Sequence, residues 1–246
     1  MSDVQGKVAL VTGGSRGIGA AIAVRLAEFG SDVAITYAQS KERADEVVDK
    51  IRAHGRRGVA IKADSAAADE VVAAVERTVD ELGGLDVLVN NAGVFPFGPI
   101  DDVPLEEVDR TLGIHARAVY LASQAAVRHM VEGGRIISIG SNLAERVPFS
   151  GVTLYAMSKA ALIGFTRGLA RDVGDRGITV TLVQPGSTDT DMNPADGPTA
   201  DDQRALSALG RYANPTDIAD MVAFLSGPGG RNITGAVLTV DGGTNA

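Results

Sequence analysis

The chain of 246 residues contains no cysteine and no tryptophan, and only 4% of its residues are aromatic. Without cysteine, disulfide bonds, thiolate metal sites and thiol catalysis are excluded. The three histidines and the carboxylates have no spacing typical of metal ligands, so we expect no catalytic metal. Apolar runs of membrane-spanning length are missing, and the N-terminus lacks a basic segment followed by an apolar one. The sequence therefore predicts no membrane contact and a cytoplasmic location.

Positive charge is also scarce, because 23 Lys and Arg stand against 31 Asp and Glu, a formal net charge of −8. This balance disfavours nucleic acid and anionic membranes as principal partners and favours a small-molecule substrate. Hydrophobic residues make up 45% of the chain, enough for a substantial core. No linker, repeat or low-complexity block divides the sequence, so we expect a single domain over residues 1–246.

A glycine-rich turn near the N-terminus is the most informative segment. Residues 8–11 form an apolar run typical of a strand buried on both faces, and a helical pattern follows the turn and stops at Gly30. At Gly13, Gly17 and Gly19, any larger side chain would keep a pyrophosphate from the backbone N–H groups and the helix N-terminus. A tight turn without a ligand would use the same glycines. The other turn residues that we expect at a cofactor are Ser15, Arg16 and Ile18.

Apolar strands and amphipathic helices alternate along the rest of the chain. The expected strands are residues 8–11, 32–37, 57–63, 85–91, 135–139, 179–183 and 236–240. The expected helices are residues 18–29, 42–54, 68–82, 105–130, 154–172 and 214–226. This alternation predicts an α/β fold, a Rossmann-type doubly wound parallel sheet with helices on both faces.

A second motif lies at the end of the strand at residues 85–91, which closes with two asparagines followed by Ala-Gly. Buried amides need backbone partners, and small residues leave space beside a ring and a ribose. With the turn Thr-Gly-x-x-x-Gly-x-Gly, this motif resembles the short-chain dehydrogenase/reductase family, and in particular its 3-oxoacyl-[acyl-carrier-protein] reductases. The resemblance spans residues 6–243 and implies seven strands in the order 3-2-1-4-5-6-7. It also implies cofactor contacts at Asn91, Ala92 and Gly93, although these asparagines could tie strands together without a cofactor.

The end of the second strand bears on the choice of cofactor. A carboxylate there would hold the ribose 2′-hydroxyl and repel a 2′-phosphate, but the strand ends at Tyr37 with no carboxylate. Arg16, Ser40 and Lys41 could instead face a phosphate dianion. The alternatives are that Ser40 is the N-cap of the next helix and Lys41 its solvated first residue. We expect NADP(H) rather than NAD(H).

The resemblance implies further cofactor contacts beyond the third and sixth strands. Asp64 would contact the adenine edge, or would instead cap the following helix. Thr188 by its backbone and Thr190 by its hydroxyl would hold the nicotinamide amide. Turn chemistry alone would account equally well for the Pro-Gly that precedes them. The set is completed by Tyr37, Ser65, Tyr155, Pro185 and Gly186.

Tyr155 and Lys159 lie four residues apart and therefore share one helix face. A phenol with a reference pKa of about 10 is a weak base at neutral pH, and an ammonium at about 4 Å would lower its pKa. Alone, the pair could be an ordinary amphipathic pair. With Ser141 it resembles the family's catalytic set. Tyr155 would then exchange a proton with a substrate oxygen that Ser141 orients, while Lys159 also reaches the cofactor ribose.

His115 departs from the family pattern, which has an asparagine that holds a water of the proton path. A histidine could hold this water or share the proton, because its reference pKa is about 6.5. It could instead pack against the sheet with one N–H on a carbonyl. Both interpretations stay open, and His115 counts as a candidate catalytic residue.

The implied activity is the interconversion of a ketone, such as a 3-oxoacyl or cyclic ketone, and a secondary alcohol. Residues 191–209 are rich in polar and turn-forming residues and are expected to form a mobile substrate lid. A modest, partly apolar pocket would suit a 3-oxoacyl thioester, a cyclic or aromatic ketone, or a polyketide intermediate. Its candidate residues are Phe95, Pro96, Phe97, Leu143, Ala144, Glu145, Val147, Phe149 and Met192.

An alternative function and an assembly state also follow from the resemblance. Residues 186–197 and the Ile-His-Ala at His115 are similar to a cyclic-di-GMP-binding biofilm dispersal protein of the same family, which would make the chain a cofactor-binding regulator. Family members are usually homotetramers or homodimers that associate through two long helices, here 105–130 and 154–172. Small residues on these helices allow close packing, although they also suit helix-on-sheet contact: Ala116, Ala118, Ala122, Ala125, Ala160 and Ala161.

Overall fold

A computed structural model describes residues 4–246 and contains one seven-stranded parallel sheet. In spatial order its strands are β3 (Gly58–Lys62), β2 (Asp32–Tyr37), β1 (Val8–Val11), β4 (Val87–Asn90), β5 (Arg135–Ile139), β6 (Thr179–Pro185) and β7 (Ala236–Val240). The strand register places Leu10 of β1 beside Ala34 of β2 and Leu88 of β4. The order 3-2-1-4-5-6-7 and the doubly wound fold class are confirmed.

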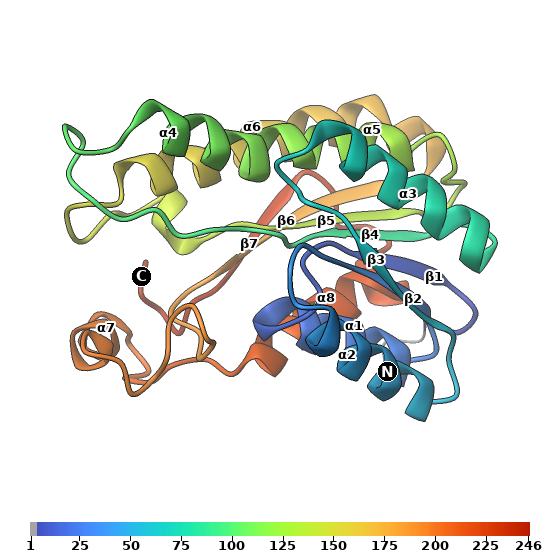
Figure 1. The fold of residues 1–246 in the computed structure, drawn as a ribbon, viewed down its shortest axis with the longest axis horizontal. Helices are drawn as coiled ribbons and strands as arrows, with labels where there is room; N and C mark the ends of the chain where they lie inside the picture. Colours follow the sequence, from blue (N-terminus) through green and yellow to red (C-terminus); the bar gives the residue numbers. More distant parts are fainter. Residues whose placement is uncertain (1–3) are drawn as a thin grey trace.

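Helices cover both faces of the sheet (Figure 1). One face carries α1 (Gly17–Glu28), α2 (Lys41–Ala53) and α8 (Pro215–Ser226). The other carries α3 (Ala68–Leu82), α4 (Leu105–Leu112), α5 (Ala118–Ala126) and α6 (Thr153–Asp172). A short helix, α7 (Ala200–Leu206), lies apart from both layers, near the C-terminus.

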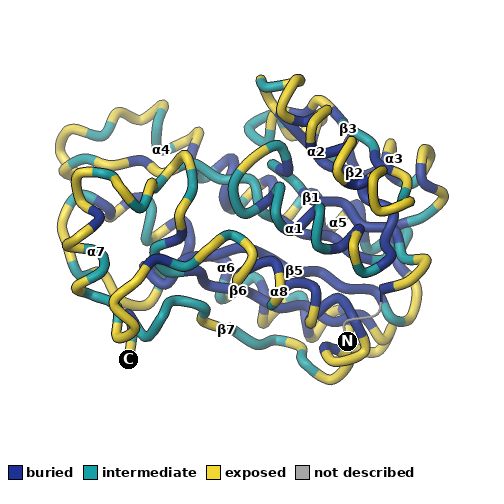
Figure 2. Tube along the Cα trace, turned by 90° about the horizontal axis from the view of Figure 1, so that it is seen from below, coloured by how far each residue is buried: buried dark blue, intermediate teal, exposed yellow. Residues whose placement is uncertain are grey.

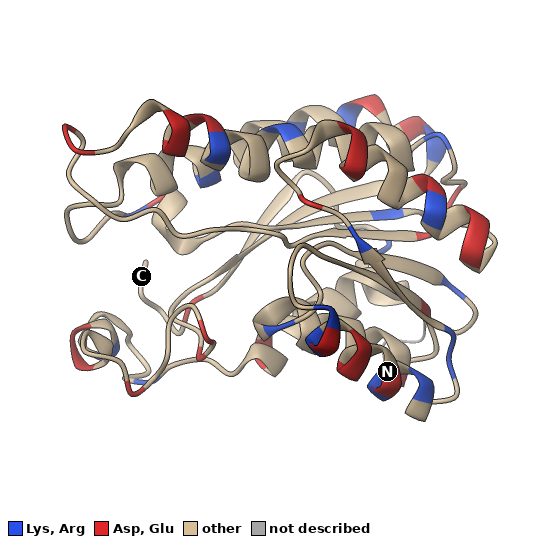
Figure 3. Ribbon diagram, viewed as in Figure 1, with Lys and Arg blue, Asp and Glu red and all other residues tan. Residues whose placement is uncertain are grey.

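Two apolar layers explain why the strands read as unbroken apolar runs. In β1, Ala9 and Val11 pack toward α1 and α8, whereas Val8 and Leu10 pack toward α3 and α5, and all four are buried. Burying a side chain such as Leu10 contributes about 1.5–3 kcal/mol to folding. Figure 2 shows the inner strands as buried and the edge strand β7 as only partly buried. Charges of both signs lie mainly on the surrounding helices (Figure 3).

The helix expected over residues 105–130 is the largest difference from the sequence-based expectation. It is divided into α4 and α5 by a π-helical turn, Gly113–Arg117, and α5 ends at Ala126. The π turn covers only five residues, and no residue type marks it, so side-chain periodicity does not reveal it. Such turns are frequent at functional sites, and this one contains His115.

Two further observations concern the expected lid and the length of the helices. The expected lid, residues 191–209, contains regular structure in the form of α7. Among the described residues, no helix is both long enough and apolar enough to cross a membrane.

The glycine turn after β1 packs directly on the core. A Cβ added to Gly14 would lie 2.6 Å from Cγ2 and 2.7 Å from Cβ of Ile35, a branched and fully buried side chain. Since neither atom belongs to the flexible end of a side chain, a methyl group at Gly14 would force the turn away from β2.

Gly14→Ala is expected to lower the free energy of unfolding by about 1–3 kcal/mol because it overpacks this contact. Urea unfolding followed by circular dichroism measures the change. Gly84→Ala is the matched control, because a Cβ at Gly84 meets no atom within 4 Å among the described residues. Equal stability of the Gly14 and Gly84 variants would show that the turn relaxes freely.

Candidate active site

The three residues expected to act on a substrate meet at the carboxyl edge of the sheet. Ser141 follows β5, and Tyr155 and Lys159 lie at the start of α6. The Ser141 side chain lies beside the Tyr155 hydroxyl, whose pKa it lowers, and the Lys159 ammonium lies 5.8 Å from the centroid of the Tyr155 ring. Ser141 Oγ also accepts a hydrogen bond from Leu143 N at 3.2 Å, which fixes the turn that carries it.

The pKa values of this cluster differ from the sequence-based expectation. Burial raises the pKa of Tyr155, and the hydrogen bond with Ser141 opposes this only in part. Burial also lowers the pKa of Lys159 to about 8. Its Nζ donates to the carbonyl oxygen of Ile139 at 3.0 Å. The expected net lowering of the Tyr155 pKa is therefore wrong, because loss of contact with water dominates the pKa of this phenol.

His115 is enclosed at the π turn with both ring nitrogens engaged. The amide N–H of Val94 donates to Nε2 at 3.0 Å, so Nε2 carries no proton and Nδ1 is the protonated nitrogen. Nδ1 then donates to Ser158 Oγ at 2.8 Å, and this hydroxyl donates to the carbonyl oxygen of Tyr155 at 2.7 Å. The ring thus joins the loop after β4 to the first turn of α6.

This environment also fixes the charge of His115. Burial, and then the nearby charge of Lys159, lower its pKa to about 2, although the hydrogen bond from Val94 opposes them. The interpretation of His115 as a residue that shares the proton is therefore wrong, because the ring stays neutral. The alternative of an N–H on a carbonyl is wrong in detail, because the acceptor is a hydroxyl.

The loop after β4 packs closely against this cluster. A Cβ on Gly93 would lie 3.2 Å from Nε2 of His115 and 3.6 Å from Nζ of Lys159. The ring of Phe95 meets the ring of Tyr155 edge-on, with centroids 4.7 Å apart. Five of the expected pocket residues are large apolar side chains that are 39–68% exposed: Phe95, Phe97, Val147, Phe149 and Met192.

The glycine turn fits a dinucleotide pyrophosphate. Gly13 and Gly17 adopt positive φ of +64° and +54°, a conformation that favours glycine. A Cβ on Gly19 would lie 2.4 Å from Gly13 O and from Asn91 Nδ2, so the turn is pressed against the end of β4. Asn91 Nδ2 donates to the carbonyl oxygens of Thr12 and Gly13 at 2.9 and 3.1 Å. No side chain at these glycine positions therefore covers the N–H groups at the start of α1.

The amide group of Asn91 is thus committed to the protein, as the strand-tying interpretation anticipated. In the same way, Asn90 Nδ2 donates to Ser123 Oγ at 3.2 Å. Any cofactor contact at this motif must come from its backbone, from Ala92 and Gly93, or from the remaining amide oxygens.

The groups expected at a 2′-phosphate lie where β2 ends. Arg16 is the N-cap residue of α1, and Ser40 is the N-cap residue of α2, but the Ser40 hydroxyl does not cap the helix. Lys41 pairs with Asp45 at 2.6 Å. Sequence reasoning missed Arg43, which lies in the first turn of α2 and pairs with Asp191. A third cation so close to Ser40 and Lys41 was the available signal.

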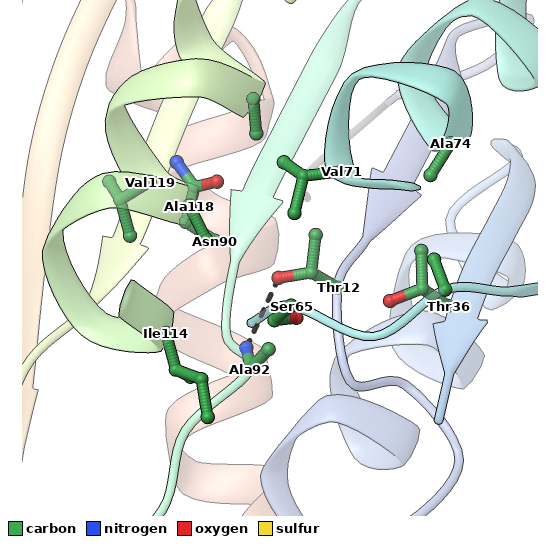
Figure 4. Close-up of a pocket in the computed structure, with 12 residues that line it drawn as sticks. Thr12, Thr36, Ser65, Val71, Ala74, Asn90, Ala92, Ile114, Ala118 and Val119 are labelled. Atoms are coloured by element: carbon green, nitrogen blue, oxygen red, sulfur yellow. Dashed lines mark hydrogen bonds between the residues drawn. The ribbon is translucent and has the colours of Figure 1, made fainter. Parts of the chain in front are cut away.

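A pocket lies between the ends of the inner strands and the helices α3 and α5 (Figure 4). Ser65 and Ala92, both expected near the cofactor, line it beside Thr12, whose Oγ1 accepts from Ala92 N at 3.1 Å. Sequence reasoning missed Thr36 and Ile114 in its wall. It begins at the strand ends, where a doubly wound sheet binds nucleotides.

Asp64 lies beside this pocket in a local turn. Its Oδ1 accepts from Ala66 N at 2.9 Å, whereas the N-cap residue of α3 is Ala67. The interpretation of Asp64 as the helix cap is therefore wrong. The carboxylate closes the preceding turn, because a side-chain oxygen reaches the N–H two residues ahead.

The segment after β6 brings the lid onto the glycine turn. Pro185 ends β6, and the Thr188 hydroxyl donates to Gly186 O at 3.0 Å. Thr190 lies so close to Gly17 that a Cβ on this glycine would be 3.3 Å from Thr190 Cγ2. The segment that leads into the lid therefore lies beside the glycine turn. In the described part of the chain, no three His, Asp or Glu side chains gather as a metal site would require.

Comparison with known proteins places the chain among oxidoreductases. The family described as "Enoyl-(Acyl carrier protein) reductase" matches residues 13–245. A short-chain dehydrogenase from Burkholderia cenocepacia, solved in complex with NADP, is 62% identical, with a TM-score of 0.98 over 99% of both chains. A cyclic-di-GMP-binding biofilm dispersal mediator protein from Escherichia coli is 45% identical over 100% of both chains. A hydroxynaphthalene reductase-like protein from Metarhizium guizhouense is 40% identical, over 97% of this chain and 95% of the relative.

The neutral state of His115 predicts a specific dependence of stability on pH. Below about pH 6.5 the unfolded chain binds a proton at this histidine that the folded ring does not bind until about pH 2. The folded state therefore loses about 1.4 kcal/mol per pH unit below about pH 6.5 relative to a variant without the imidazole. Urea unfolding of native protein and His115→Asn between about pH 7.5 and about pH 5 tests this. A stability difference that stays constant over this range contradicts the assignment.

Proposed function

This chain belongs to the short-chain dehydrogenase/reductase family, and we propose that it is an NADP(H)-dependent oxidoreductase that interconverts a ketone and a secondary alcohol. The observation that carries the proposal is the meeting of Ser141, Tyr155 and Lys159 at the same sheet edge as the glycine turn. The NADP complex of the relative from Burkholderia cenocepacia supports the cofactor.

Tyr155 acts as the acid in the direction of reduction. NADPH, when bound, supplies a hydride to the carbonyl carbon. Because burial raises its pKa, the phenol of Tyr155 is protonated at neutral pH and can donate its proton to the substrate oxygen. Ser141 orients that oxygen through its hydroxyl. Lys159, with a pKa of about 8, can return a proton from Nζ, and in oxidation the same steps run in reverse.

His115 is a positioning residue in this mechanism. It holds the backbone of Val94 on one side and, through Ser158, the backbone of Tyr155 on the other. The loop that follows Val94 carries Phe95, whose ring contacts Tyr155. These bonds therefore fix the position of the Tyr155 phenol relative to that loop.

The cofactor would lie along the carboxyl edge from the pocket at Ser65 to the lid. The pyrophosphate would meet the backbone of the glycine turn, and the adenine would meet the pocket wall at Ala92. Thr188 and Thr190 would face the nicotinamide amide, since the lid begins beside Gly17.

The substrate is proposed to be a cyclic or aromatic ketone. Phe95 and Phe97 stack with ring centroids 6.5 Å apart, and Phe95 also contacts Tyr155. Planar apolar side chains therefore lie next to Tyr155, the proposed acid. The printed name of the relative from Metarhizium guizhouense, a hydroxynaphthalene reductase-like protein, agrees with this class. A 3-oxoacyl thioester remains the second substrate class, as for the 3-oxoacyl reductases that the sequence resembles.

The chain is further proposed to act in the cytoplasm as a homotetramer or homodimer. Tyr120 of α5 is 57% exposed, and its ring lies 6.2 Å from that of Phe165 of α6. These rings give the two helices an apolar outer surface that a second copy could cover.

A regulatory function is the second candidate. It is favoured by the E. coli relative, whose printed name describes cyclic-di-GMP binding. The intact Ser141, Tyr155 and Lys159 favour turnover, because a protein that only binds ligands does not need a positioned acid with a shifted pKa.

Tyr155→Phe is expected to lower the rate of NADPH oxidation over a panel of cyclic and aromatic ketones by about 10²–10⁴-fold, because it removes the proton donor. NADPH affinity, followed by cofactor fluorescence, should stay close to the native value. Tyr120→Phe is the matched control, since it removes a phenol hydroxyl from the exposed face of α5. A Tyr155 variant with native rate would refute the mechanism. If native protein binds NADPH but reduces no ketone, and cyclic-di-GMP raises its Tm, the regulatory function is correct.

Arg16→Ala is expected to weaken NADPH binding roughly three- to tenfold and to leave NADH binding unchanged, because a half-exposed guanidinium contributes modestly to a phosphate contact. Lys50→Ala removes an exposed cation from the last turn of α2 and controls for net charge. Titrations of both cofactors at constant ionic strength measure the effect. Equal losses for NADPH and NADH would contradict a 2′-phosphate contact.

A further inference from the structure

One carboxylate of the lid lies between two arginines of the cofactor-binding half. Oδ2 of Asp191 is 3.9 Å from Nη1 of Arg16 and in close contact with Nη1 of Arg43. Arg16 is the N-cap residue of α1, and Arg43 lies in the first turn of α2. Because both guanidinium groups approach the same oxygen atom, they face a common point in space.

That point has the surroundings of a phosphate site. It adjoins the N-terminus of α2, a helix of 13 residues, where the hydroxyl of Ser40 is not used as a cap. It also lies beyond the end of β2, at Tyr37, where a doubly wound fold places the adenosine ribose. The Asp191 carboxylate is therefore a stand-in anion, held where an anion of the cofactor would be bound.

Hydrogen bonds within the lid and to the segment before it, residues 186–190, hold together the segment that carries Asp191. Gln203 Oε1 accepts from Ser187 Oγ at 2.7 Å and from Asn193 Nδ2 at 2.8 Å, and Asn193 N donates to Thr190 O at 3.0 Å. Within residues 4–246, the ion pairs that connect the lid to α1 and α2 both run through Asp191. Loss of these two ion pairs at Asp191 is therefore expected to affect the position of the whole lid.

We propose that Arg43 and Arg16 together bind the 2′-phosphate of NADP(H), and that Asp191 competes with this phosphate for both guanidinium groups. The inference rests on the proposed cofactor, and it adds Arg43 as a contact and Asp191 as a determinant of specificity. Arrival of the phosphate displaces the carboxylate and frees the lid from α1 and α2. A cofactor without the phosphate leaves Asp191 in place, so the lid stays attached.

The size of the competition follows from exposure. The side chains of Arg16, Arg43 and Asp191 are 51%, 52% and 52% exposed, and ion pairs at such positions are weak. Removing the carboxylate charge should therefore strengthen binding of a 2′-phosphate by roughly two- to fivefold. The effect should shrink at high ionic strength, because exposed charges are screened.

The test uses 2′,5′-ADP and 5′-AMP as probes, because they differ only in the 2′-phosphate and lack the nicotinamide. In calorimetric titrations, Asp191→Asn should bind 2′,5′-ADP roughly two- to fivefold more tightly than the native protein and should bind 5′-AMP equally. Asp202→Asn is the matched control, an exposed lid carboxylate with no ion pair among the described residues. Arg43→Gln should weaken 2′,5′-ADP binding and leave 5′-AMP binding unchanged.

Limited trypsin digestion measures how accessible the lid is to a protease. The lid contains one cleavage site, Arg204, and is followed by another, Arg211. 2′,5′-ADP should speed cleavage at these sites in the native protein, whereas 5′-AMP should not. In Asp191→Asn, cleavage should be fast without any ligand. These outcomes do not depend on catalytic turnover.

Failure of this inference and failure of the cofactor assignment give different results. If native protein and Asp191→Asn bind 2′,5′-ADP equally, or the variant binds it less tightly, the competition is overturned while NADP(H) binding stands. If native protein binds 2′,5′-ADP no better than 5′-AMP, the 2′-phosphate site is wrong, and the inference falls with it.

Discussion

The hydrogen bonds from the Asn91 amide to the carbonyl oxygens of Thr12 and Gly13 are the interaction on which the rest of the site depends. They fix the glycine turn against the end of β4, so that the start of α1 and the loop after β4 share one edge. A parallel sheet places all strand ends on that edge, but it does not fix the positions of the following loops relative to one another. The amide does this, because it binds two consecutive carbonyl groups of the turn.

From that fixed edge, a second set of contacts reaches α6. Gly93 leaves space for His115 and Lys159, and the imidazole connects Val94 to Ser158. The site therefore combines a buried neutral ring, a buried amine and a partly exposed phenol. Burial holds the phenol in its protonated form, which is the form that reduction of a carbonyl needs, and weakens the hold of the amine on its proton.

The opposite end of the edge is governed by exposed charges instead of buried ones. Arg16, Arg43 and Asp191 are each about half exposed, so their mutual attraction is weak and easily redirected by a competing anion. Strong, desolvated contacts thus surround the reacting groups, and weak, exchangeable contacts surround the cofactor's entry. A lid that must release product is better held by the second kind.

The sequence by itself determined the fold class, the strand order through its family resemblance, and most element positions. Buried parallel strands require unbroken apolar runs, and a phosphate turn requires glycine, so both leave local patterns. It also identified Ser141, Tyr155 and Lys159, which the structure brings together.

Only the tertiary structure decided the π turn at His115, the tautomer of its ring, the direction of the Tyr155 pKa and the pairing of Arg43 with Asp191. The two members of that ion pair are 148 residues apart. Periodicity and spacing report the geometry of a few neighbouring residues, whereas burial and ionic partners come from segments distant in the chain. For that physical reason the chemical identity of the site was readable from the sequence, but its protonation states and its connection to the lid were not.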